Sequence, residues 1–218
     1  MLENVEVLCH SSIRFSKGNT IYFDPFKIET NYNDADVIFI THDHYDHYSE
    51  EDIGKIVKED TVIVIPEDLK TKVLKKGWKE ENIITVIPNK SYTVKNIEFQ
   101  TVPAYNVNKQ FHQKENNWVG YLVNMEGITY YISGDTDITK ENKKVKCDVA
   151  FVPVGGTYTM DYKEAAELIN EIKPKVAVPT HYGSIIGSKK DGAKFAKLVD
   201  ADIVVDKVKM ERGKWWLQ

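Results

Sequence analysis

The stretch Thr41-His42-Asp43-His44-Tyr45-Asp46-His47 decides how this sequence is interpreted. It follows an uninterrupted apolar run at 37–40, which is typical of a strand covered on both faces. Three of the six histidines of the chain and two aspartates, Asp43 and Asp46, lie in its last six residues. Imidazole and carboxylate groups are the ligands that zinc and similar divalent ions accept in catalytic sites. The stretch therefore predicts a metal site after a buried strand, rather than a solvated polar loop.

The spacing of these residues indicates two neighbouring metal positions. His42 and His44 lie two residues apart, so in an extended segment their side chains point the same way. Asp46 and His47 follow where the chain turns toward a helix that we expect from Ser49, so they can aim at a second point nearby. One short loop is therefore able to supply ligands to two adjacent ions.

Further ligands are expected at the carboxyl ends of other strands, where loops gather along one edge of a sheet. Asp135 closely follows the apolar segment 130–132 and can bridge two ions; a turn aspartate is an equally good reading of this residue alone. His181 closely follows the apolar segment 176–179, where an ordinary loop histidine is the alternative. We interpret both as candidate ligands, because the first loop alone completes neither position.

Length and composition indicate one folded domain. The chain has 218 residues, 42% of them hydrophobic and 28% charged, and no Pro- or Gly-rich linker divides it. We therefore expect a single domain over 1–218. The net charge of −4 argues against a nucleic-acid surface, since phosphate binding depends on Lys and Arg. The composition leaves the oligomeric state open.

The cysteines and the N-terminus point to a cytoplasmic protein. Cys9 and Cys147 lie far apart and each flanks an apolar run, which favours buried reduced thiols over a disulfide. The first ten residues lack the basic and apolar regions of a signal peptide. No window of 18 residues is apolar enough for a transmembrane helix. A reducing cytoplasm is therefore the expected location.

Hydrophobic periodicity predicts short strands alternating with amphipathic helices. Strands are expected at 5–9, 20–23, 37–40, 61–65, 83–87, 91–94, 97–102, 118–124, 128–133, 149–153, 176–179 and 203–205. Helices are expected at 49–58, 67–76, 161–172 and 189–199. Two strand-rich halves with helices suggest an α/β protein built as a four-layer αββα sandwich. We expect Trp215 and Trp216 to close an edge of this sandwich.

The ordered set of motifs resembles the metallo-β-lactamase-fold hydrolases. The His-x-His-x-Asp-His signature matches at 42–47, the Gly-Asp-Thr element at 134–136, and the final histidine at His181. The opening segments Cys9-His10-Ser11-Ser12 and Tyr22-Phe23-Asp24-Pro25-Phe26 resemble a branch with lactonase-like and phospholipase D-like members. The resemblance covers nearly the whole chain and implies the αββα fold of that family.

The resemblance also implies how two ions are held. His42 and His44 would bind the first ion. The second ion would be bound by Asp46, His47 and His181. Asp135 would bridge the two ions. Zinc is the expected metal, with manganese or iron as alternatives. Asp46 and Asp135 are also the candidate catalytic residues, because either carboxylate can steer the proton of an attacking water.

This chain departs from the family at one ligand. The family adds a third histidine to the first position from a strand end, but here that strand ends Thr101-Val102-Pro103-Ala104-Tyr105-Asn106. His112, six residues further on, restores the ligand if its loop folds back, and a plain surface histidine is the alternative. Asn106, through its carbonyl, and Tyr105 are the other candidates for this place. Without any of them, the first ion would be loosely held or replaced by another, such as manganese.

Four further features have roles to be decided. Asp24 either orients a ligand histidine through its other ring nitrogen or makes a turn before Pro25. His10 is interpreted as structural. The loop 155–161 lies where it can contact substrate or cap a helix. Trp118 either lines the pocket or packs in the core.

Together these residues predict a metal-dependent hydrolase. Two ions would bridge a water and lower its pKa to about 7, so that hydroxide attacks a carbonyl or phosphoryl centre. The acidic composition favours a small-molecule ester, lactone or amide over a nucleic acid. The alternatives are a phosphodiesterase, including an RNA-processing enzyme, an iron-dependent oxidoreductase acting on thiols or oxygen, and a binding protein with a decayed metal site. Asp46 argues against the last of these, because a decayed site has no reason to keep this acid.

Overall fold

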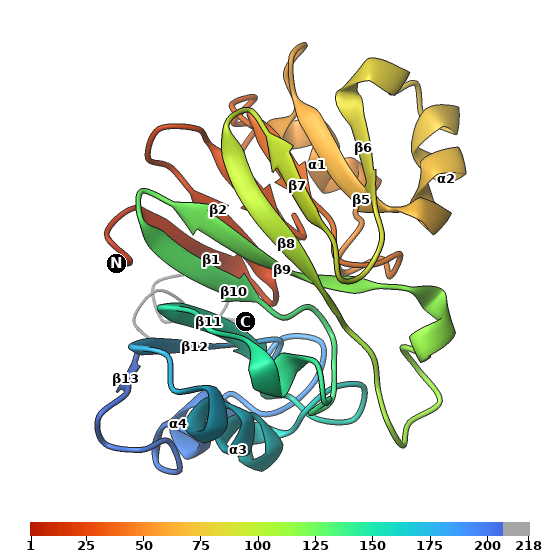
Figure 1. The fold of residues 1–218 in the computed structure, drawn as a ribbon. Helices are drawn as coiled ribbons and strands as arrows, with labels where there is room; N and C mark the ends of the chain where they lie inside the picture. The colour runs from red at the N-terminus through yellow and green to blue at the C-terminus, as the bar shows by residue number, and fades with distance from the viewer. Residues whose placement is uncertain (207–218) are drawn as a thin grey trace.

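Two β-sheets pack face to face in the computed structural model, which describes residues 1–206 (Figure 1). The first sheet has six strands in sequence order: β1 (Val5–Cys9), β2 (Ser12–Phe15), β3 (Ile21–Phe23), β4 (Val37–Phe39), β5 (Val62–Pro66) and β6 (Ile83–Val86). The second sheet has seven, in the order β13 (Val204–Val205), β12 (Val176–Thr180), β11 (Val149–Pro153), β10 (Ile128–Ile132), β9 (Val119–Met125), β8 (Ile97–Pro103) and β7 (Ser91–Val94).

Parallel pairing brings several loops to one edge of each sheet. β3 to β6 are mutually parallel in the first sheet, and β10 to β13 are mutually parallel in the second. The carboxyl ends of neighbouring parallel strands lie at the same edge, where ligands bind in open α/β sheets. The loops that follow β4, β10 and β12 therefore leave from the edges expected for a site.

An aromatic core fixes how the two sheets sit on each other. Phe23 and Phe39 of the first sheet are stacked, with ring centroids 4.8 Å apart. Phe39 meets the ring of Tyr121 from the second sheet at 5.0 Å, and Phe15 meets that of Tyr130 at 5.0 Å. Such offset and edge-to-face pairs add to the free energy gained by burying the rings. The packed core therefore sets the distance between loops contributed by different sheets.

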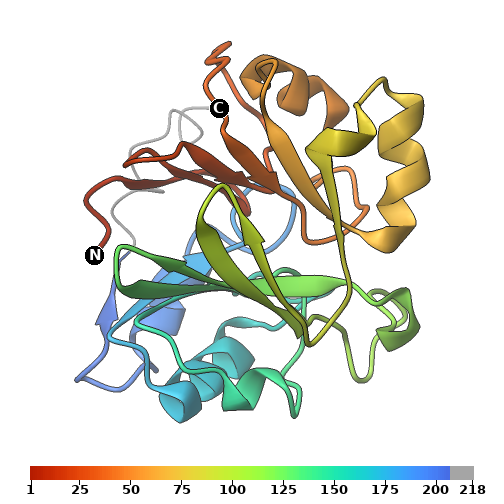
Figure 2. The same ribbon diagram turned by 45° about the horizontal axis from the view of Figure 1, so that its top comes forward.

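Helices cover the outer face of each sheet (Figures 1 and 2). The first sheet carries α1 (Glu50–Ile56) and α2 (Lys70–Lys75), and the second carries α3 (Tyr162–Ile172) and α4 (Asp191–Ala196). Short 3-10 turns are η1 (Glu67–Leu69), η2 (Glu80–Asn82), η3 (Lys114–Asn116) and η4 (Asn142–Lys144). The order helix, sheet, sheet, helix confirms the predicted four-layer sandwich.

The elements differ from the prediction in three places. β2 was not predicted, because its four residues are too few to show a period; it pairs with β1 as an antiparallel hairpin. The predicted helix 189–199 is only Asp191–Ala196, and the predicted helix 67–76 begins as the 3-10 turn η1. Trp215 and Trp216 lie outside the described residues, so their expected place at an edge stays a prediction.

The described residues contain neither a disulfide nor a membrane-spanning helix. Cys9 and Cys147 are both free thiols; Cys9 is buried as expected, whereas Cys147 is only partly buried, and burial raises the pKa of the Cys147 thiol to about 12. Within residues 1–206, the helices are too short or too polar to cross a bilayer.

Candidate metal centre

The loop after β4 forms a tight turn that divides its candidate ligands between two places. The backbone N–H groups of His47 and Tyr48 both donate to the carbonyl oxygen of His44, at 3.0 and 2.8 Å. Ser49 then caps α1 by accepting the N–H of Asp52. The chain thus passes from extended backbone into a helix, as predicted. The turn separates the two histidines before it from the aspartate and histidine after it.

The first group consists of His42, His44 and His112, whose ring nitrogens all lie within 4.8 Å of one another. The Nε2 atom of His42 is 3.2 Å from Nδ1 of His44 and 3.3 Å from Nε2 of His112. His42 and His112 are almost completely buried. Three imidazoles that converge on one point form the ligand set that zinc accepts in catalytic sites.

The second group consists of His10, Asp46, His47 and His181, and all four residues are buried. Asp46 Oδ2 lies 3.2 Å from Nε2 of His10, 3.6 Å from that of His181 and 3.8 Å from that of His47. Three of these residues were predicted to share a metal position. His10 was interpreted as structural, and its place in this group was missed. The available signal was its position directly after a strand, which it shares with the other candidate ligands.

Asp135 lies between the two groups. Its Oδ2 atom is 3.3 Å from Nε2 of His112 and 3.1 Å from Nε2 of His181, and its Oδ1 atom is 3.4 Å from Nε2 of His47. Gly134 allows this approach, because a Cβ atom there would lie only 3.1 Å from the Cβ of Thr41, and its φ of 63° is in the left-handed region that favours glycine. One carboxylate therefore touches imidazoles of both groups, which is the arrangement required of a bridging ligand.

His112 reaches the first group from a loop, not from a strand end. The phenol of Tyr105 donates to Glu141 at 2.7 Å, so its hydroxyl is engaged away from the cluster. Asn106 holds the loop, because its backbone N–H donates to the carbonyl of His112 at 2.8 Å. Of the three candidates for the missing ligand, His112 is the one whose ring nitrogen lies among those of His42 and His44, 3.3 Å from Nε2 of His42.

The amide of Asn106 fixes the loop to its surroundings. Its Nδ2 donates to the carbonyl of Phe111 at 3.0 Å and to that of Tyr158 at 2.7 Å, and lies 3.3 Å from Nδ1 of His112. Because both amide hydrogens have carbonyl acceptors, the orientation of the amide is determined by these contacts. Asn106 thus positions the loop that carries His112.

Asp24 orients the loop after β4 from behind. Its Oδ2 atom lies 2.8 Å from Nδ1 of His47 and accepts the hydroxyl of Thr41 at 2.7 Å, while Oδ1 accepts the N–H of Thr41 at 2.8 Å. The same hydroxyl oxygen lies 2.9 Å from Nδ1 of His42. A carboxylate on Nδ1 leaves Nε2 of the same ring free to face a metal. The structure therefore favours the orienting role over a simple turn before proline.

Four residues of the site have left-handed backbone conformations. The φ angles are 56° at His10, 45° at Asp24, 56° at His112 and 54° at His181. Side chains other than glycine adopt this region at a cost of about 1–2 kcal/mol, and such residues gather at functional sites. The surrounding structure therefore holds these four side chains in place against a local preference.

The two carboxylates are ionised within the cluster. Burial opposes the charge of Asp135, but the nearby imidazoles of His181 and His47 lower its pKa well below the ordinary value. Burial likewise opposes the charge of Asp46, and His10 and His181 lower its pKa. Both groups can therefore accept hydrogen bonds or bind a cation at neutral pH.

The imidazoles divide into two kinds. Burial, together with the neighbouring ring of His47, lowers the pKa of His42 well below its ordinary value, and burial with His181 lowers that of His10 to about 4. Burial opposes the charge of His47, yet Asp135 and Asp24 raise its pKa. The negative charge of the buried carboxylates can therefore be neutralised in two ways: by protons on imidazoles such as His47, or by a divalent ion that replaces those protons.

Unpartnered buried atoms test whether a metal fits. Among the described residues, hydrogen-bond partners are lacking for both ring nitrogens of His10 and His181, Nε2 of His47 and Oδ1 of Asp135. A buried polar group without a partner costs about 1–3 kcal/mol. All these atoms are nitrogen or oxygen donors of the kinds that zinc, manganese and iron accept. The residues therefore fit a metal.

Comparison with known proteins agrees with this geometry. The family described as "Beta-lactamase superfamily domain" matches residues 4–181. The chain belongs to the β-lactamase superfamily. A relative from Pyrococcus furiosus, named UPF0173 metal-dependent hydrolase, is 30% identical over 210 residues, 89% of this chain and 91% of the relative. A relative of the same name from Saccharolobus solfataricus is 33% identical over 191 residues, 80% of this chain and 78% of the relative. These relatives confirm the prediction of a metal-dependent hydrolase; they identify neither substrate nor metal.

Solved structures of the β-lactamase superfamily share the fold. A metal-dependent hydrolase from Parabacteroides distasonis is 29% identical, with a TM-score of 0.80 over 93% of this chain and 90% of that protein. A metallo hydrolase from Ignicoccus hospitalis has a TM-score of 0.78 at 21% identity, over 94% of each chain. The fold assignment is thereby confirmed over nearly the whole chain.

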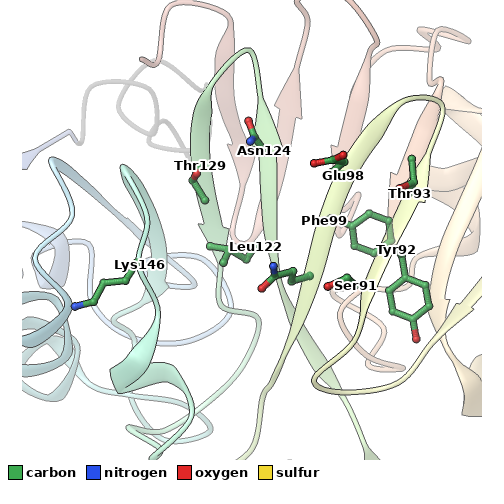
Figure 3. A pocket seen from close by; sticks show the side chains of 10 residues that line it. Ser91, Tyr92, Thr93, Glu98, Phe99, Leu122, Asn124, Thr129 and Lys146 are labelled. Carbon is green, nitrogen blue, oxygen red and sulfur yellow. The ribbon is translucent and has the colours of Figure 1, made fainter.

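Away from the candidate metal centre, the chain has a hollow on the outer face of β7 to β9 (Figure 3). It encloses about 620 Å³. Its lining residues are Ser91, Tyr92, Thr93, Glu98, Phe99, Gln100, Leu122, Asn124, Thr129 and Lys146. They include no histidine or cysteine, and the groups of possible metal ligands among the described residues all lie elsewhere.

Proposed function

We propose that this chain hydrolyses an ester, lactone or amide bond of a small molecule, using two metal ions held by the two groups. The observation that carries the proposal is the position of Asp135, whose carboxylate touches His112 of the first group and His47 and His181 of the second. A single carboxylate shared in this way suits two adjacent ions better than one. Zinc is the proposed metal, because imidazole and carboxylate are its usual catalytic ligands, and manganese or iron would suit the same atoms.

The residues of the two groups would have different roles in this reaction. His42, His44 and His112 would hold one ion, and Asp46, His47 and His181 the other. When bound, such ions act as Lewis acids and make a water nucleophilic at neutral pH. Asp46 and Asp135 are ionised and accept hydrogen bonds only, so either carboxylate would orient the attacking water and steer its proton.

Aromatic and apolar side chains around the centre support a neutral organic substrate. Trp118 covers the first group, with its ring 4.9 Å from His42 and 5.0 Å from His44. Phe111 and Tyr158 pack edge to face at 4.8 Å, and both are exposed. Aromatic side chains that line a ligand site typically contact the apolar part of the ligand.

The lysines near the metal centre also favour a carbonyl substrate over a phosphodiester. Lys72 is ion-paired with Asp43 of the loop after β4, and Lys109 is ion-paired with Asp137. A phosphodiester would be recognised by cations free to contact its oxygens. Because these two lysines already have carboxylate partners, a carbonyl substrate is the better match.

A substrate panel tests this proposal. Zinc-loaded protein is assayed on chromogenic aryl esters, an aliphatic lactone, an aryl amide and bis(p-nitrophenyl) phosphate. We expect metal-dependent turnover of at least one carbonyl substrate and a loss of ~10²-fold or more in His44→Ala. Asp43→Asn, in the same loop but directed at Lys72, is the matched control and should keep metal and turnover. Turnover confined to the phosphodiester, or turnover that persists without metal, would contradict the proposal.

A further inference from the structure

His10 is the one histidine of the cluster without an assigned role. It follows β1 directly, in the turn to β2, and its side chain has no exposed surface. His181 comes from the opposite sheet, after β12. The two rings nevertheless meet with centroids 3.8 Å apart. The turn of the first sheet thus delivers an imidazole to a point that the second sheet also reaches.

The ring of His10 lacks the partner that burial demands. Its Nε2 atom is 3.2 Å from Oδ2 of Asp46, but neither ring nitrogen forms a hydrogen bond with any described residue. His47 and His181 share this property at Nε2, and both face the same carboxylate. Three imidazole nitrogens that surround one carboxylate oxygen without bonding to it leave a place for a cation among them.

The backbone of His10 is held as firmly as that of the predicted ligands. Its φ of 56° equals that of His112 and is close to the 54° of His181. Its carbonyl accepts the N–H of His181 at 3.1 Å, which ties the β1–β2 turn to the end of β12. A strained conformation that is fixed by a bond between two sheets places the ring, rather than merely filling space.

We propose that His10 is a further side-chain ligand of the second metal position, beside Asp46, His47, His181 and the shared Asp135. This inference rests on the proposed metal centre. It makes the two positions unequal: apart from the shared Asp135, the second would have four side-chain ligands and the first three, one of which, His112, comes from a loop. The second position therefore binds its ion more tightly and fills first.

Zinc titration of the metal-free protein against a chelator of known affinity tests this inference. The wild-type chain should bind two ions in two steps. His10→Asn, which shortens the side chain but tolerates a left-handed backbone, should weaken the tighter step by at least ~100-fold and leave the weaker step unchanged. His44→Ala is the matched control and should affect the weaker step only. Reversal of this pattern, or a change of less than ~3-fold at both steps in His10→Asn, would overturn the inference.

Two further readouts separate a ligand from a supporting role. Cobalt bound at the tighter position should show a changed visible absorption spectrum in His10→Asn, because a ligand of the ion has been lost. A loss of only ~10-fold with an unchanged cobalt spectrum would overturn the ligand role, since that is the effect of a residue that acts through Asp46. Thermal unfolding of the metal-free variant, compared with wild type, checks that it folds. If wild-type protein binds no metal, the proposed function itself fails; if it binds two ions and His10→Asn binds them equally well, only this inference fails.

Discussion

Asp24 shows how a residue outside the proposed ligand set determines the geometry of the centre. It joins the backbone and hydroxyl of Thr41 to the ring of His47, and Thr41 in turn contacts the ring of His42. One buried carboxylate thus orients a ring in each group. Residues in this relation to a metal are usually worth 10–100-fold in affinity.

Asp24→Asn should therefore lower zinc affinity by ~10–100-fold at the second position, because the amide is a weaker acceptor for the ring nitrogen of His47. The measurement is competition with a zinc chelator. Asp36→Asn is the control: Asp36 also accepts a backbone N–H, from Thr20, but contacts no histidine of the cluster. Unchanged affinity in Asp24→Asn would show that the ring is oriented by other contacts.

At the residue scale, the sequence was informative where the candidate ligands are close together along the chain. The residues at 42–47 were predicted from their spacing, and Asp135 and His181 from their strands. His112 was one of several alternatives, because loop closure through Asn106 depends on Tyr158, a residue far away in sequence. The position of His10 in the cluster was not predicted for the same reason: its neighbours are Asp46 and His181, and only the packing of two sheets brings them together.

At the scale of elements, α1 anchors the segment that precedes the metal loop. Asp52 of α1 accepts the backbone N–H groups of Lys27 and Ile28, at 2.8 and 2.9 Å. The same carboxylate also accepts hydrogen bonds from the hydroxyl of Ser49 at 2.7 Å and from the ammonium group of Lys55 at 3.0 Å. Helix and loop are therefore tied at one carboxylate, a contact that helix periodicity does not reveal.

The pH dependence of stability should report on Asp52. Burial opposes its charge, but the bonds from Ser49, Lys55 and the loop backbone lower its pKa below the ordinary value of 3.8. A carboxyl whose pKa is lower when folded stabilises the protein above 3.8 and loses that effect as pH falls through the folded-state value. Metal-free Asp52→Asn should therefore be less stable than wild type by about 1.5–3 kcal/mol at pH 7. The difference in stability between wild type and Asp52→Asn should become smaller as the pH falls below 3.8.

Urea unfolding of both proteins between neutral and acidic pH measures this difference. Glu51→Gln, on the exposed side of the same helix, should change stability by less than about 0.5 kcal/mol and serves as control. A gap that stays constant on acidification would contradict the role of the charge on Asp52.

At the scale of the whole molecule, the proposed centre joins the two sheets. His42, Asp46 and His47 follow β4 of the first sheet, whereas Asp135 and His181 follow β10 and β12 of the second. The sandwich was predictable because apolar runs and helix periodicity mark its layers. β2 was not, because four residues carry too little pattern to be recognised without their hairpin partner.

Metal removal should therefore lower the stability of the whole fold. A ligand that binds only the folded state at 1,000 times its Kd contributes about 4 kcal/mol, which for a domain of this size is roughly 8–16 °C in Tm. Calorimetry of zinc-loaded protein with and without EDTA measures the shift. An equal Tm in both samples would mean that the ions do not bridge the sheets.

Anomalous diffraction at the zinc edge, from crystals of the zinc-loaded protein, tests the central claim most directly. We predict two peaks on opposite sides of the Asp135 carboxylate. His42, His44 and His112 should lie about 2.0–2.1 Å from one peak, and His47 and His181 about 2.0–2.1 Å from the other. A single peak, or none at these residues, would contradict a dinuclear centre.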